Sequence, residues 1–274
     1  MFDTILLEMC ILCAAGLLMS AIGFYRVVYF ISIGYAFSIC LMAIIAPLRF
    51  MDELTWVSIL QNILFLWWGL RLGIFLVRRE AKSSYRGEIA EVHKSSAQMG
   101  IPKRALIWVG VSVLYVLMYS PGLFMLLQFE SALDSTSDYI LPVIGLIIMA
   151  GGTVLESVAD SQKSSFKKSQ PRRFCDTGIY RLVRCPNYLG EILFWVGSFI
   201  IPIGVYSSPF QWMSVLIGLI CIVLIMLGST KRLEFSQDDR YGKDPEYQEY
   251  TKRVPVLIPW IPLYSLKKIK VFLE

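Results

Sequence analysis

Seven long apolar runs dominate the sequence and restrict the folds open to it. They lie at residues 4–23, 27–48, 55–77, 105–128, 139–158, 187–205 and 210–229. Each approaches the roughly 20 residues that an α-helix needs to cross a bilayer. With 56% hydrophobic and 17% charged residues, the chain is too apolar for one soluble core. Because lipid offers no partners to open backbone groups, we predict an all-α polytopic membrane protein with seven transmembrane helices.

Basic residues alternate between the loops that join these runs. The 78–104 and 159–186 loops each contain seven Lys or Arg residues, whereas the 129–138 loop has three acidic residues and no base. Basic loops stay cytoplasmic, which predicts an N-terminus outside and a C-terminus in the cytoplasm. The absence of internal targeting signals favours a bacterial inner membrane. The net charge of +5 then reflects topology or an anion site on that face, and no nucleic-acid partner is expected. The first run, with Asp3 and Glu8 and no base, is expected to be a retained span.

Motifs typical of soluble nucleotide-binding proteins are missing from the sequence. It contains neither a Gly-rich dinucleotide fingerprint nor a P-loop. Because His93 is the only histidine, a His/Cys metal site is not expected. Cys10 and Cys13 form a C-x-x-C pair in an apolar run, where small packing residues are favoured over a redox pair. Without repeats or a second soluble domain, residues 1–274 are predicted to form a single membrane domain.

Polar residues recur at helical spacing near the inner ends of the last three runs. They are Glu156, Asp160, Lys163 and Lys167; Asn187 and Glu191; and Thr230, Glu234, Asp238 and Tyr241. Residues three or four apart share one face of a helix. A helix emerging into water would carry the same stripe, but ionisable groups at the membrane edge also suggest function. We expect the stripes to converge on a cytoplasm-facing polar pocket with acidic walls and a basic rim.

The start of the sixth run favours a phosphate site. Pro186 suits the first turn of a helix, and Arg181 and Arg184 lie just before it. Free backbone N–H groups and two guanidinium groups together bind phosphate well. The alternative is a basic loop beside the membrane that leads into a capped helix.

The first three runs are expected to form a mainly apolar part of the bundle, with few candidate functional residues. Arg71 lies about 9 Å from the inner end of the third run, and it either extends toward water or points inward to an anion. Tyr35 and Trp68 are potential hydrogen-bond donors, although packing is the commoner role.

In the tail, Trp260 and Tyr264 suit the headgroup level of a membrane and the neighbouring lysines suit anionic lipid. Three prolines between residues 255 and 262 argue against one continuous helix there.

Several of these segments resemble the steroid 5α-reductase-like membrane proteins. Residues 178–191, GIYRLVRCPNYLGE, resemble the signature G-x-Y/F-R-x-x-R-H-P-N-Y-x-G-E, with Cys185 in place of the usual His. The segments ESVADSQKSSF at 156–166, KRLE at 231–234 and EYTKRVPVLIPW at 249–260 fit the same family, as does LWWGLRLG at 66–73. The resemblance covers roughly residues 25–260.

This resemblance implies an NADPH-dependent reductase of a conjugated C=C bond in a lipophilic substrate, such as a 3-oxo-4-ene steroid or a steroid-like lipid. The substrate would enter from the bilayer, with helices of residues 1–128 on the substrate side and residues 129–274 holding the cofactor. Loops 78–104 and 159–186 would act as lids, and no obligate protein partner is implied. With the polar stripes included, the expected cofactor contacts are Glu156, Asp160, Lys163, Lys167, Tyr180, Arg181, Arg184, Asn187, Tyr188, Glu191, Glu234, Asp238 and Tyr250.

The resemblance also implies where the substrate carbonyl is bound. In the animal enzymes a Glu in the second span and a Tyr in the third hold the keto oxygen, and by spacing Tyr35 and Trp68 fall near these positions. With Arg71, they form the predicted catalytic set. The second span has no obvious Glu, which leaves the identity of the substrate open.

Two other functions fit parts of the sequence. An S-adenosylmethionine-dependent membrane methyltransferase shares a similar R-H-P-x-Y-x-G segment, but it has a later Glu-Glu pair where this chain has Glu234 followed by Phe235. A transporter or structural protein without catalysis is the third possibility. Transporters usually contain internal repeats and helices broken near mid-membrane, which this sequence lacks.

Overall fold

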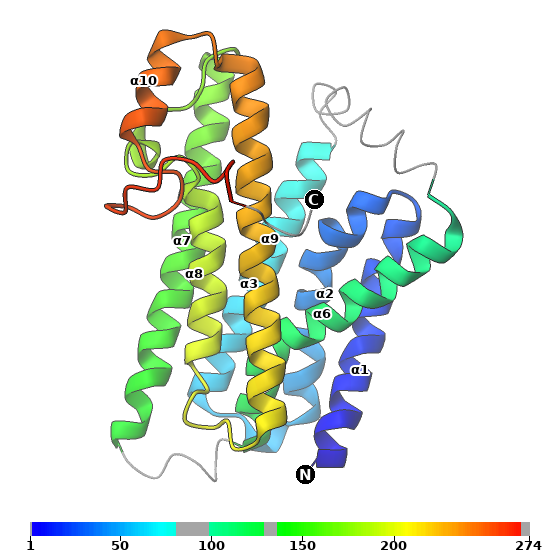
Figure 1. Cartoon of the computed structure of the whole chain (residues 1–274). Helices are drawn as coiled ribbons and strands as arrows, with labels where there is room; N and C mark the ends of the chain where they lie inside the picture. The colour runs from blue at the N-terminus through cyan, green and yellow to red at the C-terminus, as the bar shows by residue number, and fades with distance from the viewer. Residues whose placement is uncertain (1, 81–98, 129–135, 270–274) are drawn as a thin grey trace. The chain divides into compact units, whose positions relative to one another are not determined.

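A computed structural model describes residues 2–80, 99–128 and 136–269. The described residues form α-helices and short 3-10 helices, and none of them lies in a strand. The main helices are α1 (Phe2–Ser20), α2 (Ile33–Arg49), α3 (Trp56–Glu80), α6 (Ile101–Gln128), α7 (Ile140–Ser169), α8 (Pro186–Ile200), α9 (Pro209–Tyr241) and α10 (Pro245–Arg253) (Figure 1). The predicted all-α class is therefore confirmed.

Among the described residues, six helical segments are long and apolar enough to cross a membrane. They are Phe2–Phe24, Val27–Arg49, Trp56–Glu80, Ile101–Leu127, Ile140–Ser169 and Pro209–Tyr241. Together they indicate an integral, multi-pass membrane protein. The predicted bacterial inner membrane and the predicted orientation stay predictions.

The remaining predicted span, 187–205, is shorter in the structure. Helix α8 has 15 residues, a length of about 22 Å, whereas the hydrocarbon core is about 30 Å thick. It ends at Ile200, two residues before Pro202, because proline cannot donate the backbone hydrogen bond and disfavours helical backbone before it. Six of the seven expected spans are thus long apolar helices, and the seventh is a short one.

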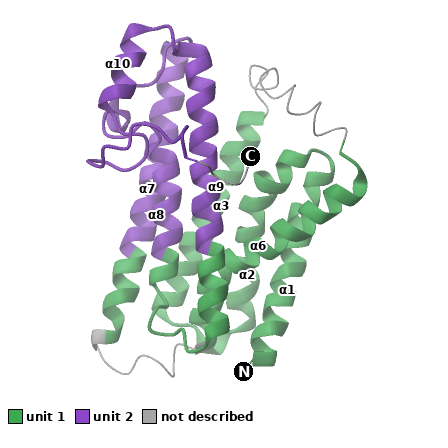
Figure 2. Ribbon diagram, viewed as in Figure 1, with its two compact units in different colours: residues 1–146, 198–218 green, residues 147–197, 219–274 purple. Residues whose placement is uncertain are grey.

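Two compact units make up the chain (Figure 2). Unit 1 contains Met1–Leu146 and Ser198–Gly218, and unit 2 contains Ile147–Gly197 and Leu219–Glu274. These units are defined by how the chain packs. The predicted functional division at residue 128, between a substrate side and a cofactor side, is a separate one and stays a prediction. Loop 78–104 was expected to act as a lid, and its residues 81–98 lie outside the described part of the chain.

In unit 1, α2 contacts α1, α3 and α6. Backbones approach closely where α2 meets α3: a Cβ atom on Gly69 would lie 2.7 Å from Ala36 O. Near the other end of α2, Arg49 donates two hydrogen bonds to Glu8 of α1, at 2.5 and 2.7 Å. The Glu8 carboxylate, which lies in an apolar helix, is thereby paired with a cation, as a buried charge requires.

Candidate functional site

Unit 2 is built on a close crossing of α7 and α8. A Cβ atom added to Gly152 would lie 2.5 Å from the backbone N of Phe194, and one on Gly190 would lie 2.7 Å from the backbone N of Glu156. Only glycine allows two helix backbones to approach so closely, as in small-residue contacts between membrane helices. The crossing brings the helices that carry the first two polar stripes together, with Glu156 and Glu191 buried on them.

The loop that links these helices is bound back to α7. Gly178 has φ +60, a left-handed conformation that suits glycine, and the next residue donates its N–H to Gln162 Oε1 at 3.0 Å. Tyr180 donates to the carbonyl of Ala159, and Tyr250 of α10 donates to Tyr180 O at 2.7 Å. Burial raises the pKa of both phenols above the ordinary value, so both stay neutral donors.

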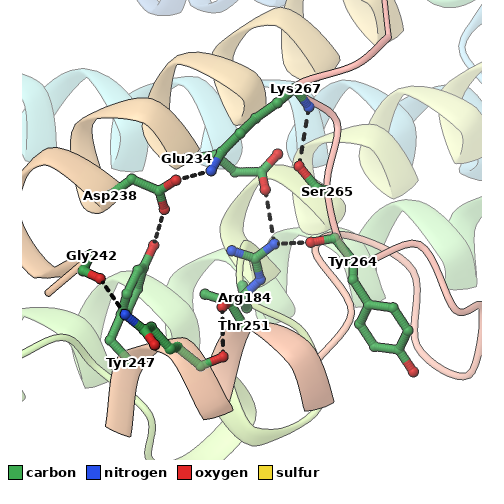
Figure 3. A pocket seen from close by; sticks show the side chains of 10 residues that line it. Arg184, Glu234, Asp238, Gly242, Tyr247, Thr251, Tyr264, Ser265 and Lys267 are labelled. Carbon is green, nitrogen blue, oxygen red and sulfur yellow. Dashed lines mark hydrogen bonds and ion pairs between the residues drawn. The ribbon is translucent and has the colours of Figure 1, made fainter. Parts of the chain in front are cut away.

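A buried ion pair joins the end of this loop to α9. Arg184 Nη2 lies 2.9 Å from Glu234 Oε1, and both side chains are at most 3% exposed. Arg184 also donates to Tyr264 O at 2.5 Å, and the backbone N of Leu266 donates to Glu234 Oε2 at 2.8 Å. The two charged groups point toward one another beside the segment that contains Tyr264 and Ser265 (Figure 3). Arg184 Nε is buried and has no hydrogen-bond partner among the described residues.

A cavity of about 220 Å³ lies beside this pair. Asp238, one helical turn after Glu234, accepts a hydrogen bond from Tyr247 at 2.9 Å and forms an ion pair with Lys267 (Figure 3). Burial raises the pKa of Tyr247 to about 12, although the nearby Arg184 opposes this shift. Cationic and anionic groups therefore alternate around this cavity.

A second cavity, of about 70 Å³, is lined by predicted cofactor residues. Lys163, Lys167, Tyr180, Arg184 and Tyr250 all contribute to its wall. Lys167 donates to Tyr241 Oη at 2.7 Å and to a backbone carbonyl at 2.5 Å. The structure thus brings five of the predicted residues, from α7, α10 and the loop before α8, around one small space.

The third cavity is the largest of these three, at about 650 Å³, and its wall contains three arginines and three acidic residues. Arg173 is paired with Asp176 at 2.9 Å and with Glu246 at 3.0 Å. Arg181 and Arg253 are exposed and form no ion pair with any described residue. These two guanidinium groups line the groove with their donors available.

The other predicted cofactor residues lie in unit 2 but do not line these three cavities. They are Glu156, Asp160, Asn187, Tyr188 and Glu191. Tyr188 packs against a buried cluster that contains Cys185, Val256 and Leu266. Cys185, which replaces the usual histidine of the resembling family, is 1% exposed, and burial raises the pKa of its thiol to about 12.

The predicted catalytic residues belong to unit 1. Tyr35 and Trp68 are buried, and their rings meet edge to face with centroids 5.2 Å apart. The Tyr35 ring also stacks on Tyr115 at 5.3 Å, and Tyr115 donates to Phe30 O at 2.5 Å. Arg71 is half-buried on α3, one turn after Trp68. The structure therefore groups Tyr35 and Trp68 in one aromatic cluster.

Arg173 and Arg253 were not among the predicted site residues, although both line the largest groove. Arg173 was counted only among the bases that set topology. Arg253 lies directly after Lys252 in the segment EYTKR, which belongs to a motif of the resembling family. That position in the motif could have identified Arg253 as a candidate site residue.

Comparison with known proteins identifies a family. The model of a family described as a protein of unknown function, DUF1295, matches residues 23–254. No curated protein matches the chain, and neither does any solved structure. This family is linked to steroid 5α-reductase-like membrane proteins, as the motifs around residues 178–191 suggest. Because the match covers most of its length, the chain belongs to the DUF1295 family.

Proposed function

We propose that the chain is an NADPH-dependent reductase of the conjugated C=C bond in a lipophilic enone, such as a 3-oxo-4-ene steroid or a steroid-like lipid. The observation that carries this proposal is the gathering of motif residues around three cavities in unit 2, each of which has basic side chains in its wall. Arg184 and Tyr250 each line two of these cavities. The substrate is proposed to enter from the bilayer and the cofactor from the cytoplasm.

The residues of the largest groove suit a phosphorylated dinucleotide. Its volume of about 650 Å³ falls within the range of about 300–1,000 Å³ typical of ligand sites. Arginine binds phosphate bidentately, and Arg181 and Arg253 have donors available for that purpose. We assign them to the 2′-phosphate and assign Lys163 and Lys167, beside the second cavity, to the remaining phosphates. Tyr250, which lines both cavities, offers an aromatic face.

When bound, NADPH would supply a hydride to the β-carbon of the enone. The chain's own task is then to stabilise the negative charge that develops on the carbonyl oxygen. Tyr35 and Trp68 carry O–H and N–H donors, and Arg71 carries a cation. We propose that these three residues polarise the carbonyl.

The proposal is tested by nucleotide binding to the full-length protein in nanodiscs. Arg253→Gln should weaken NADPH binding by about tenfold or more, because a hydrogen bond to a charged group contributes about 1.5–3 kcal/mol. Binding of NADH, which lacks the 2′-phosphate, should be nearly unchanged. Lys252→Gln is the matched control, since the neighbouring Lys252 is exposed but does not line the groove.

Other outcomes would assign the chain differently. Equal effects of the two variants on both nucleotides would remove Arg253 from the site. If neither nucleotide binds and labelled S-adenosylmethionine donates a methyl group to lipid or protein, the methyltransferase alternative holds. If NADPH does not bind, NADH does not bind and no methyl group is transferred, both enzymatic functions are rejected.

A further inference from the structure

The segment after α10, residues 255–267, returns over unit 2, and we call it the C-terminal strap. Its first limb is bound by backbone hydrogen bonds of 3.0 Å from Arg184 to Pro255 and from Cys185 to Val256. Its second limb contacts the buried ion pair through Tyr264 and Leu266, and Asp238 through Lys267. Val256 N donates to Leu263 O at 2.9 Å and joins the limbs. The strap is thus a closed loop of unit 2, and both of its limbs are bound to the rest of that unit.

The tip of the strap is apolar and exposed. Ile258, Trp260 and Ile261 are 41%, 93% and 49% exposed. Trp260 has φ +62, which is unfavourable for a residue with a Cβ atom. Packing against unit 2 does not explain why a tryptophan is presented in this conformation. An exposed apolar group of this kind marks an interaction surface.

The level of the strap along α9 indicates which surface the tip meets. The apolar run of α9 ends near Ser229, and Glu234, which binds the strap, lies five residues further on. At 1.5 Å per residue this is about 7.5 Å beyond the hydrocarbon core. The headgroup layer extends about 5–8 Å from the core on each side. The base of the strap, where Leu266 binds Glu234, therefore lies at the depth where Trp and Tyr are most enriched in membrane proteins.

The charge of the strap favours lipid of a particular kind. Lys267 is paired with Asp238, whereas Lys268 is exposed directly after it. An exposed lysine at the base of an apolar loop suits an anionic bilayer, because basic residues near such a surface are attracted to its negative potential. We propose that the strap tip inserts into the headgroup layer of the adjacent leaflet, with Lys268 on anionic phospholipid, and that the bilayer thereby holds the strap closed over Arg184 and Glu234.

This proposal makes closure of the strap depend on the membrane. Val256, Leu257 and Leu266 of the strap cover Cys185, which is 1% exposed. Cys175, in a separate cluster with Ala159 and Tyr180, has no strap residue in its cluster. Alkylation of Cys185 therefore reports opening of the strap, and alkylation of Cys175 is an internal control.

The first measurement locates the Trp260 side chain in the full-length protein in nanodiscs. The chain has seven tryptophans, so the Trp260 signal is the fluorescence of wild type minus that of Trp260→Phe. We expect lipids brominated near the headgroup to quench this difference signal, and aqueous iodide to quench it little. Quenching by iodide without quenching by bromolipid would overturn the proposal, because the tip would then lie in water or on a soluble partner.

The second measurement follows maleimide labelling of Cys185 and Cys175 by mass spectrometry. In nanodiscs of phosphatidylcholine with phosphatidylglycerol, Trp260→Ser should raise the labelling rate of Cys185 by about tenfold, equivalent to about 1.4 kcal/mol, and leave Cys175 unchanged. In wild type, omitting phosphatidylglycerol should also raise the labelling rate of Cys185. Lys268→Gln should reduce this lipid dependence, whereas the exposed Lys252→Gln of α10 should preserve it.

Two results would contradict membrane closure. Equal labelling of Cys185 in both lipid mixtures and in Trp260→Ser would show that the strap is held by unit 2 alone. A parallel rise at Cys175 would indicate unfolding of unit 2 rather than opening of the strap. The comparison of lipid mixtures uses wild-type protein, so the test stands even if a variant fails to fold.

Discussion

At the scale of residues, the Arg184–Glu234 pair is the most constrained feature of unit 2. Removing two charges from water costs several kcal/mol each, and their attraction offsets this cost only when the remaining donors and acceptors are paired. Here Tyr264 O and the backbone N of Leu266 supply such partners. The pair therefore couples the loop before α8 to α9 and to the C-terminal strap.

We predict that Arg184→Met destabilises the protein by about 3–5 kcal/mol, because Glu234 would be left as an uncompensated buried charge. The double variant Arg184→Met/Glu234→Leu should recover most of this loss, since hydrophobic replacements of a buried pair are often neutral. Thermal unfolding in one detergent would measure both effects. If the double variant is as unstable as the single one, the unpaired Glu234 charge is not the cause of the lost stability.

The sequence predicted this site only in part. Arg184 and Glu234 were both expected to contact the cofactor, because each occurs in a motif of the resembling family. Their direct pairing was not predicted, since they are 50 residues apart and local periodicity carries no information about such contacts. The strap contacts were missed for the same reason, although Trp260 and Tyr264 had been placed at the membrane interface.

At the scale of elements, the crossing of α7 and α8 depends on glycine. Gly151 and Gly152 are adjacent in sequence, yet their surroundings differ. A Cβ atom on Gly152 would clash with the backbone of α8, whereas one on Gly151 would meet nothing within 4 Å. The sequence does not distinguish these two adjacent glycines, and the packing shows which one lies at the helix crossing.

We predict that Gly152→Ala destabilises unit 2 by about 1–3 kcal/mol, because overpacking must push α7 and α8 apart. Gly151→Ala is the matched control and should be neutral or stabilising by about 0.5–1 kcal/mol, since alanine favours the helix. A thermal shift assay in nanodiscs would compare the two. Similar losses for both variants would argue against the crossing.

At the scale of the whole molecule, the alternation of basic and acidic loops is the main topological information. The basic loops 78–104 and 159–186 predict one side of the membrane, and the acidic 129–138 loop predicts the other. Helix α8 departs from the expected pattern, because its 15 residues are short for a bilayer of average thickness. Orientation therefore requires a direct measurement.

We predict that alkaline phosphatase is active when fused after residue 138 and inactive when fused after residue 104, because that enzyme folds only outside the cytoplasm. A fluorescent protein fused at the C-terminus should be fluorescent, as expected for a cytoplasmic end. The reverse pattern would place the basic loops outside and would separate the proposed cofactor site from cytoplasmic NADPH.

The sequence by itself determined the class of this protein, because the length and spacing of apolar runs depend only on the bilayer and on helix geometry. It also determined which residues carry charge at the inner ends of the helices. Only the tertiary structure decided which of these charges neutralise one another and which, such as Arg181 and Arg253, keep their donors available. The physical reason is that pairing depends on contacts between residues far apart in the chain, and helical periodicity places a side chain on a face without selecting the partner it meets there.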